Sequence, residues 1–155
     1  MRALLQRASR ASVSVEGKVV GEIGRGLVAL VGVARDDTEE DVRYLAEKLP
    51  NLRIFPDEAS KFNLSATDIG GGLLVVSQFT LMADTRKGRR PSFDQAAPPE
   101  VAEPLIDRLV EQLRQTGLAV ATGQFRAHML VEIHNEGPVT VLLDSREGRQ
   151  RPRLG

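Results

Sequence analysis

The chain has 155 residues, 41% of them hydrophobic and 27% charged, and its 21 basic residues balance its 21 acidic residues. This length and composition suit a single globular domain that buries its own core, and they exclude a disordered chain. Cysteine is absent, which excludes disulfides, thiolate nucleophiles and cysteine-bound metals and is typical of a reducing compartment. Because the net charge is zero, a polyanion would have to be bound by a local cluster of basic residues.

The first nine residues, MRALLQRAS, form too short an apolar run for a signal peptide. No segment of the sequence is apolar over the roughly 20 residues that a bilayer span needs. We therefore expect a cytoplasmic protein without a membrane partner.

The first 33 residues predict strands joined by tight turns. Residues 1–9 and 12–15 read as two early strands, the second with the two-residue alternation of a half-buried strand. The turn residues Glu16-Gly17-Lys18 join it to a strand at 19–23, which predicts a β-hairpin. The apolar run 27–33 is typical of a strand at the centre of a sheet.

Two helices are predicted. The first runs from about Thr38 to Leu49, with Asp37 as its N-cap, and Pro50 ends it before a short extended segment at 54–56. The second opens at Pro98 and ends near Gly117. Its buried face is predicted to consist of apolar residues at helical spacing, namely Val101, Leu105, Ile106, Leu109 and Leu113.

The most informative stretch runs from Leu73 to Phe93. Residues 73–76 follow three flexible glycines and predict a buried central strand. Directly after this strand come Ser77, Gln78, Phe79 and Thr80, which place hydroxyls and an amide where the chain leaves the sheet. The loop at 86–90 then carries four positive charges, on Arg86, Lys87, Arg89 and Arg90, and suits a polyanion such as a nucleic-acid backbone.

Three further strands are predicted at 118–121, 128–134 and 139–143, the last two separated by a break at Asn135-Glu136-Gly137-Pro138. About seven strands and two main helices indicate a mixed α/β fold with one domain over residues 1–145. Residues 146–155 are basic and rich in turn formers, and we expect a flexible C-terminal tail there.

The sequence lacks the usual catalytic sets. His128 and His134 lie six residues apart on one predicted strand, where a structural role is favoured over a metal site, and no cofactor is indicated. A Ser-His-Asp triad has no support, because Ser77 lacks the GxSxG elbow. Thr80 remains a nucleophile candidate.

Three blocks of the sequence resemble the signature blocks of the D-aminoacyl-tRNA deacylase family: SQFTL at 77–81, TRKGRRPSF at 85–93 and NEGPVT at 135–140. Similar family sequence covers residues 1 to about 145. Two positions depart from the pattern. Arg126 stands where a glycine is expected, which puts the local loop geometry in question, and Glu136 replaces the commoner aspartate and keeps its charge.

The resemblance implies a curved, barrel-like sheet and a homodimeric hydrolase without a metal or cofactor. Such an enzyme cleaves the ester between a D-amino acid, or mischarged glycine, and the 3′-terminal ribose of tRNA; DNA is not an expected partner. It also implies that the Gly137-Pro138 bond is cis and that its loop enters the other subunit's active site. There a backbone carbonyl would occupy the space that an L side chain needs.

The resemblance assigns roles to residues of this chain. Ser77 and Gln78 would hold the terminal adenosine or a water, and the backbone N–H groups of Phe79 and Thr80 would stabilise the oxyanion. The chirality filter would comprise Gly137 and Pro138, with Arg7, Met129 and Asn135 around them. Arg86, Lys87, Arg89 and Arg90 would contact tRNA phosphates.

Two mechanisms stay open: attack by Thr80 through a covalent ester, and attack by water assisted by the ribose 2′-hydroxyl. The absence of an evident base beside Thr80 favours water. Two other classes of function also remain, a tRNA acceptor-stem binding module without catalysis and a general esterase.

Overall fold

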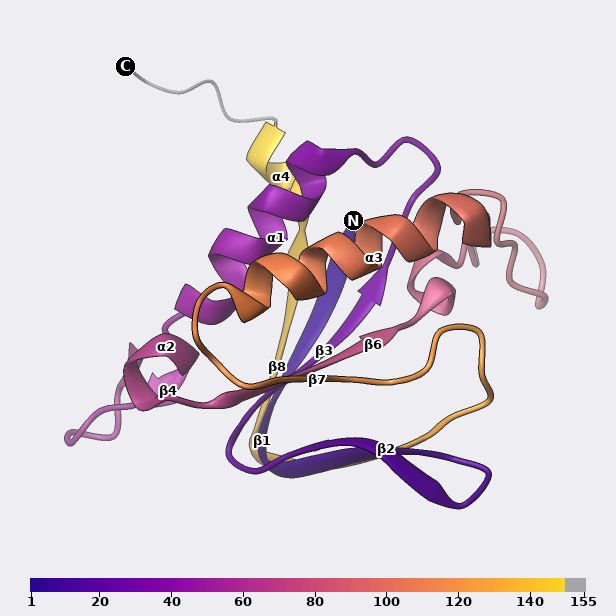
Figure 1. Cartoon of the computed structure of the whole chain (residues 1–155). Coiled ribbons are helices and arrows are strands. Elements are labelled where there is room, and N and C mark those ends of the chain that lie inside the picture. The colour runs from indigo at the N-terminus through magenta and orange to yellow at the C-terminus, as the bar shows by residue number, and fades with distance from the viewer. Residues whose placement is uncertain (150–155) are drawn as a thin grey trace.

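The computed structural model describes residues 1–149. Two long helices, α1 (Glu39–Asn51) and α3 (Pro99–Arg114), pack on one face of a curved six-stranded sheet (Figure 1). The prediction of a mixed α/β domain with two main helices is confirmed. No helix within residues 1–149 is long and apolar enough to cross a membrane.

The main sheet has the strand order β2–β1–β3–β6–β7, and β8 pairs with the opposite edge of β1. The pairs β3–β6 and β6–β7 are parallel, whereas β1 is antiparallel to all its neighbours. The bounds of these strands are β1 (Arg2–Val15), β2 (Lys18–Ile23), β3 (Gly26–Gly32), β6 (Gly72–Ser77), β7 (Val120–Thr122) and β8 (Leu130–Asp144).

Strand β1 is one continuous strand, so the prediction of two early strands is wrong. Residues 2–8 of β1 pair with β3, and residues 11–15 pair with β2 in the predicted hairpin. The far end of β2 comes close to β7, because a Cβ at Gly21 would lie only 2.3 Å from the carbonyl oxygen of Thr122. The sheet therefore curls until it is nearly a closed barrel.

The curled sheet buries apolar side chains on both faces. The larger core lies between the sheet and the helices and includes Leu5, Leu27, Leu45, Leu73 and Leu109. A smaller core lies on the other face, where Val13, Val28, Leu74 and Val76 meet the partly buried Met129. Strand β6 contributes to both cores, which explains its unbroken run of apolar residues and fixes its end in space.

The ends of the two long helices differ from the prediction. Helix α1 begins after Thr38, not Asp37, because the Asp41 carboxylate accepts a hydrogen bond from the Thr38 backbone N–H at 2.8 Å. It continues through Pro50, since a proline near the end of a helix removes little of its hydrogen bonding. In α3 the predicted core residue Val101 is 39% exposed, and Val110 is buried instead.

Several short elements escaped prediction or were predicted in part. Strands β4 (Phe55–Pro56) and β5 (Phe62–Leu64) form a small separate sheet, and α2 (Ala66–Ile69) follows them. A 3₁₀ helix, η1 (Phe79–Met82), follows β6. Residues 145–149 form the helix α4 (Ser145–Arg149), and the rest of the predicted tail, 150–155, lies outside the described residues.

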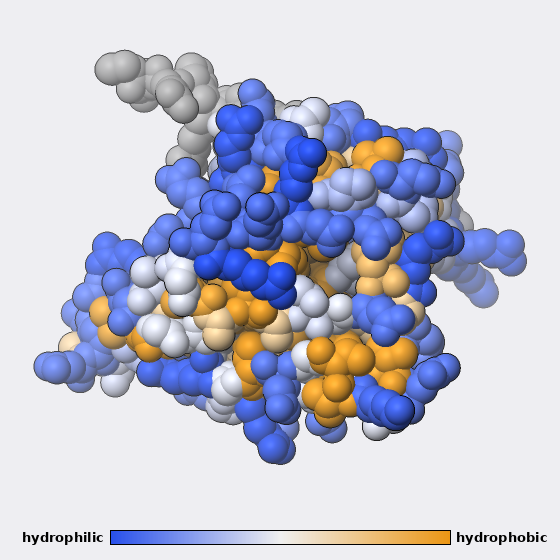
Figure 2. Space-filling model, in the orientation of Figure 1, coloured by the Kyte–Doolittle hydropathy of each residue, from blue (hydrophilic) through white to orange (hydrophobic). Residues whose placement is uncertain are grey.

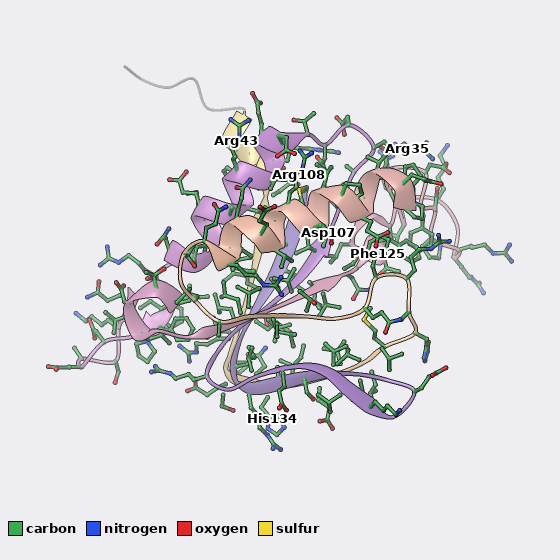
Figure 3. All side chains as sticks on the ribbon, viewed as in Figure 1. Arg35, Arg43, Asp107, Arg108, Phe125 and His134 are labelled. Atoms are coloured by element: carbon green, nitrogen blue, oxygen red, sulfur yellow. The ribbon has the colours of Figure 1, made fainter. Side chains whose placement is uncertain are left out.

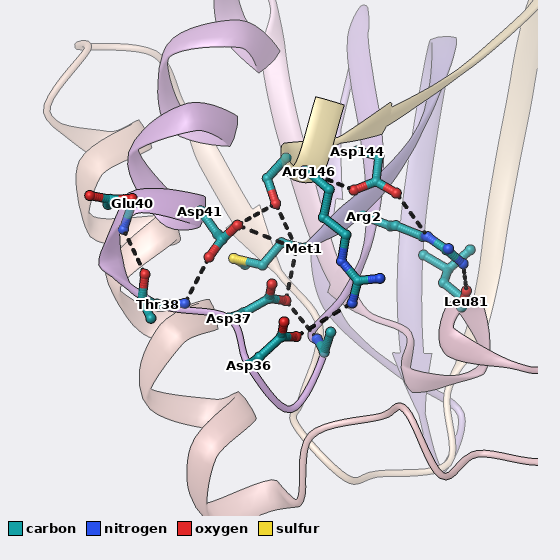
Figure 4. A network of polar contacts seen from close by, with 12 residues as sticks. Met1, Arg2, Asp36, Asp37, Thr38, Glu40, Asp41, Leu81, Asp144 and Arg146 are labelled. Atoms are coloured by element: carbon teal, nitrogen blue, oxygen red, sulfur yellow. Dashed lines mark hydrogen bonds and ion pairs between the residues drawn. The ribbon is translucent and has the colours of Figure 1, made fainter. Parts of the chain in front are cut away.

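A buried polar network fastens the N-terminus to the start of α1 and the end of β8 (Figure 4). The Met1 ammonium lies 2.7 Å from the Asp37 carboxylate and donates to Ser145 Oγ at 2.7 Å. Ser145 Oγ in turn donates to Asp41 at 2.6 Å. Because all these groups are buried, water does not solvate their charges, and the polar partners within the network stabilise each charge instead.

Candidate active site

The site begins where β6 ends. Residues 73–76 are buried, and β6 lies between β3 and β7 in the parallel part of the sheet. The Gln78 backbone N–H still donates to the Val31 carbonyl at 2.8 Å, after which the chain turns away into η1. The side chains of Ser77 and Gln78 are therefore half-buried at a rigid strand end, as the sequence predicts.

The turn η1 presents backbone N–H groups. Its first donor within the turn is the Leu81 N–H, which bonds the Gln78 carbonyl at 3.2 Å. The N–H groups of Phe79 and Thr80 precede that donor and have no acceptor inside the turn. The Thr80 hydroxyl accepts a short hydrogen bond from the Gln78 side-chain amide. Arg2 holds the far end of the turn by donating to the Leu81 carbonyl at 3.1 Å.

Gly32 allows this turn to lie against β3. A Cβ at Gly32 would lie 3.0 Å from the Leu81 Cβ and 3.1 Å from the Gln78 carbonyl oxygen. Any side chain at this position would push η1 away from the sheet. The sequence analysis missed this role, although a glycine at the end of an apolar central strand is the available signal for a close approach.

A cleft of about 570 Å³ opens between η1, the N-terminal end of α3 and residues 125–129. It brings together Ser77, Gln78, Phe79 and Met129, whereas Thr80 is not among its lining residues. Most of its lining is apolar, and Figure 2 shows apolar side chains at the surface below α3 on an otherwise hydrophilic face. Such a cleft suits a small organic group held by a few polar atoms.

Residues 125–129 form the outer wall of the cleft. A Cβ at Gly123 would lie 2.6 Å from the Met129 sulfur, so the glycine makes room for Met129. Arg126 has φ +63°, in the left-handed region that favours the glycine expected from the family pattern. The sequence analysis missed Phe125, Arg126 and His128 as lining residues.

The two histidines do not share a strand. His128 precedes β8 and lines the cleft, whereas His134 lies on β8 and accepts a hydrogen bond from Arg10 at 3.2 Å. Figure 3 shows His134 on the side of the sheet away from the helices. Within residues 1–149, no group of three His, Asp or Glu side chains could hold a metal ion.

A second cavity of about 770 Å³ adjoins the cleft and shares Ser77 and Phe125 with it. It runs along α3, where its lining includes three acidic residues, Glu103, Asp107 and Glu111, and one basic residue, Arg114. Figure 3 shows Asp107 on α3 and Phe125 nearby on the same side of the molecule. The α3 side of the site is therefore acidic and repels polyanions.

The Gly137–Pro138 stretch lies within β8, so the predicted break between two strands is wrong. Gln6 of β1 pairs with Thr140 and Ala8 pairs with Asn135, so that the four residues 136–139 bulge opposite one residue of β1, Arg7. The Gly137–Pro138 bond is cis, and Gly137 has φ +133°. A bulge allows the strand to continue while these residues project from it.

Arg7 supports this bulge from beneath. It is only 6% exposed, and its Nε donates to the Glu136 carbonyl at 3.0 Å and lies 3.2 Å from the Glu136 carboxylate. Its Nη1 donates to the Ile54 carbonyl at 3.0 Å. Asn135 closes the bulge, because its side-chain oxygen accepts from the Val139 N–H at 2.9 Å. Arg7 and Asn135 thus lie at the bulge, whereas Met129 lies at the cleft.

The cleft and the Gly137-Pro138 bulge lie far apart within one chain. The register of the sheet measures their separation. Across the strands, Ser77 pairs with Val31, Val31 with Ala3, and Ala3 with Leu143. The bulge lies opposite Arg7, which pairs with Leu27, and Leu27 pairs with Leu73. Ser77 in the cleft and the bulge are thus about four residues apart along the strands and three strands apart across the sheet, which corresponds to roughly 20 Å. Consistent with this, neither Gly137 nor Pro138 lines the cleft.

The basic loop projects beside η1. Backbone bonds between Asp84 and Ser92, at 2.7 and 2.9 Å, close its base. Phe93 packs edge-on against Phe79 with ring centroids 5.1 Å apart, which connects the loop to the cleft.

The four cations of the loop are not equivalent. Arg86 pairs with Asp84 at 2.7 Å, and its side-chain hydrogen bonds lower the pKa of Asp84 to about 2. Lys87, Arg89 and Arg90 are exposed and have no ion-pair partner in the described part of the chain. These three are free to meet an external anion.

Known proteins match this chain over nearly its whole length. A family model described as D-Tyr-tRNA(Tyr) deacylase matches residues 4–144. A D-aminoacyl-tRNA deacylase of Heliobacterium modesticaldum is 60% identical over 148 residues, 96% of this chain and 99% of that protein. A D-aminoacyl-tRNA deacylase of Chloroflexus aurantiacus is 58% identical over 155 residues, 100% of this chain and 97% of that protein.

Solved structures agree with these matches. One described as "c-Myc DNA Unwinding Element Binding Protein" has a TM-score of 0.88 at 42% identity and covers 93% of this chain and 98% of that chain. One described as "Structural Analysis of a probable eukaryotic D-amino acid tRNA deacylase" has a TM-score of 0.80 at 22% identity, covers 92% of this chain and 97% of that chain, and supports the fold alone. The family model and the relatives show that the chain belongs to the D-aminoacyl-tRNA deacylase family.

Proposed function

We propose that this chain hydrolyses the ester of D-aminoacyl-tRNA, and of glycine mischarged on tRNA, to free tRNA and amino acid. The observation that carries this conclusion is the match over nearly full length to relatives named D-aminoacyl-tRNA deacylase. The geometry agrees, because an apolar cleft ends beside the backbone N–H groups at the start of η1. An aminoacyl ester is already activated, so positioning and oxyanion stabilisation suffice for its hydrolysis.

The reaction proceeds by addition of water to the ester carbonyl. In the transition state the carbonyl oxygen becomes an oxyanion, which accepts hydrogen bonds from the N–H groups of Phe79 and Thr80. The bond from the carbonyl carbon to the ribose 3′-oxygen then breaks, and the proton lost by the water passes to that oxygen with help from the neighbouring 2′-hydroxyl. Ser77 and Gln78 hold the terminal adenosine or the water.

The surroundings of Thr80 favour water as the nucleophile. Its hydroxyl accepts from the Gln78 amide, and an amide cannot take up the proton that a nucleophilic threonine must lose. Attack by Thr80 through a covalent ester is the competing mechanism, and substitution of Thr80 separates the two.

The chirality filter comes from a second subunit in this proposal. The separation of roughly 20 Å within one chain supports it, because a bulge this far from the ester cannot contact it. In a homodimer the partner's bulge enters the cleft, and a backbone carbonyl of Gly137-Pro138 fills the space that an L side chain needs. Arg7 and Asn135 brace the bulge, and Met129 forms a wall of the cleft. A filter made of backbone tolerates any D side chain.

The remaining partner is the tRNA itself. Lys87, Arg89 and Arg90 contact its phosphates, whereas Arg86 mainly shapes the loop through its pair with Asp84. Because aminoacyl-tRNA is made and used where proteins are synthesised, we place the activity in the cytoplasm.

The test is incubation of the purified chain with matched D- and L-aminoacyl-tRNA. Loss of the D ester alone is the expected result. Binding without ester loss would instead support an acceptor-stem binding module, and equal loss of both enantiomers would support a general esterase. The variant Gln78→Ala is the matched control, because it removes an amide from the cleft and is expected to abolish turnover of the D ester while the fold is kept.

A further inference from the structure

Arg126 is the one charged side chain among the residues that line the cleft. It is exposed, and within the described residues it has no hydrogen-bond or ion-pair partner. The neighbouring lining residues Phe125, Ala127 and Met129 are apolar. An unpaired guanidinium at the mouth of an apolar cleft is free to bind an anionic part of whatever enters the cleft.

The backbone at Arg126 is in a conformation that disfavours a side chain. Its φ of +63° is left-handed, a conformation that a non-glycine residue adopts only at an energetic cost. A glycine at this position would take the same conformation without that cost. The guanidinium is therefore placed at the cleft despite a local backbone penalty.

Charge around the site is asymmetric. On the α3 side, the adjoining cavity is lined by Glu103, Asp107 and Glu111 and by one basic residue, Arg114, so its net charge is negative and repels an RNA backbone. Arg126 lies on the outer wall of the cleft, and the free cations of the basic loop lie beyond η1. An RNA 3′ end that reaches the cleft meets attraction at Arg126 and repulsion along α3.

The substrate has one anion close to its ester. The amino acid is attached to the 3′-oxygen of the terminal ribose, and the 5′-oxygen of the same ribose carries the last phosphodiester. We propose that Arg126 binds this phosphodiester and so positions the terminal nucleotide over Ser77 and Gln78. This assignment rests on the proposed function, and it adds a phosphate contact next to the ester to the contacts made by the basic loop.

Two substrates isolate this contact. One is D-aminoacyl-tRNA, and the other is the 3′-D-aminoacyl ester of adenosine, which lacks every phosphate. We expect Arg126→Gln and Arg126→Gly to lower kcat/KM on the tRNA substrate by about 10-fold or more, mainly through KM, because a charge-assisted hydrogen bond is lost. Both variants should hydrolyse the adenosine ester as the unchanged chain does. The slope of log affinity for tRNA against log salt should fall by about one.

Controls separate a phosphate contact from a structural effect. Arg126→Lys keeps the charge and should retain most of the activity, and Arg126→Gly should keep or raise Tm, because glycine suits a φ of +63°. Arg10→Gln removes an exposed arginine that pairs with His134 on β8 and does not line the cleft, so it should leave both substrates unaffected.

The proposal is overturned if the Arg126 variants slow both substrates equally, or slow neither. If the unchanged chain fails to hydrolyse either D ester, the proposed function fails instead, and this outcome is distinct from a failure of the Arg126 contact.

Discussion

At Gln78 and Thr80, the side chains and the backbone differ in their hydrogen bonding. The Gln78 side-chain amide donates a short hydrogen bond to the Thr80 hydroxyl, while the backbone N–H groups at the start of η1 remain available to donate to a ligand. We propose that η1 acts through its backbone and that the side chain of Thr80 contributes mainly to the shape of the turn. On this proposal the reaction depends on the position of η1 more than on the hydroxyl that it carries.

Replacement of Thr80 tests that reading. In the water mechanism, Thr80→Val keeps the shape of the side chain and should lower kcat only about fivefold, the effect of one neutral hydrogen bond. Thr80→Ser, which keeps the hydroxyl, is the matched control and should be nearly as active as the unchanged chain. Single-turnover hydrolysis of D-aminoacyl-tRNA measures both. Near-complete loss of turnover in Thr80→Val with intact tRNA binding would contradict water as the nucleophile.

The pair between Asp84 and Arg86 gives a pH prediction. The pKa of Asp84 falls from its ordinary 3.8 to about 2, chiefly through the side-chain hydrogen bonds from Arg86. Because the folded pKa is the lower one, the pair stabilises the loop above pH 3.8 and is lost as the pH falls through 2. An NMR titration should place the Asp84 midpoint near 2, and Arg86→Gln should raise it toward 3.8. Arg90→Gln should leave it unchanged, and a midpoint near 3.8 in the unchanged chain would refute the pairing.

Among elements, strand β8 shows what sequence patterns cannot reveal. Gly137-Pro138 reads as a break, since proline cannot donate to a ladder. The strand continues because pairing with β1 resumes on both sides of a bulge, and that pairing joins residues more than 100 positions apart. The strand at 73–76 and the helix after Pro98 were predictable, because their signals are local periodicity and caps. The positions of Ser77 and Met129 on one cleft depend on the curl of the sheet, which no local pattern reports.

Gly32 links strand β3 to the position of η1. In Gly32→Ala the new Cβ would contact Leu81 and the Gln78 carbonyl at about 3 Å, so η1 must move by a few tenths of an ångström. We expect kcat on D-aminoacyl-tRNA to fall, with a loss of about 1–3 kcal/mol in the free energy of unfolding. Gly24→Ala is the control, because a Cβ there meets nothing within 4 Å. An unchanged kcat in Gly32→Ala would show that catalysis does not depend on this contact.

At the scale of the whole molecule, a buried ion pair between the Met1 ammonium and Asp37 fastens the N-terminus to the segment that leads into α1. Asp37→Asn removes the carboxylate that lies 2.7 Å from the Met1 ammonium and leaves that cation buried, so we expect a loss of about 3–5 kcal/mol in urea unfolding. Asp36→Asn is the matched control, since Asp36 is exposed and pairs with Arg146 at 3.4 Å; it should cost less than about 1 kcal/mol. Equal losses in the two variants would contradict a specific role for the buried network.

In the proposed homodimer, each chain contributes half of each active site. Each chain carries a cleft at η1 and a bulge at Gly137-Pro138, and the register of the sheet holds them apart. The resemblance of the sequence to its family predicts that both features belong to the site, and the structure adds that one chain cannot bring them together. In the proposed homodimer, a second copy supplies the missing half through two-fold symmetry.

The most direct measurement of this central claim is complementation between two inactive variants. Gln78→Ala alters the cleft, and Gly137→Ala alters the bulge, where a Cβ would lie 3.1 Å from Arg7 Nη2 at φ +133°. Each variant alone should be inactive on D-aminoacyl-tRNA while it keeps its fold. Refolded together, half of the dimers are mixed and each carries one intact site, so about a quarter of the full activity should return. No recovery of activity in verified mixed dimers would contradict a site built from two chains.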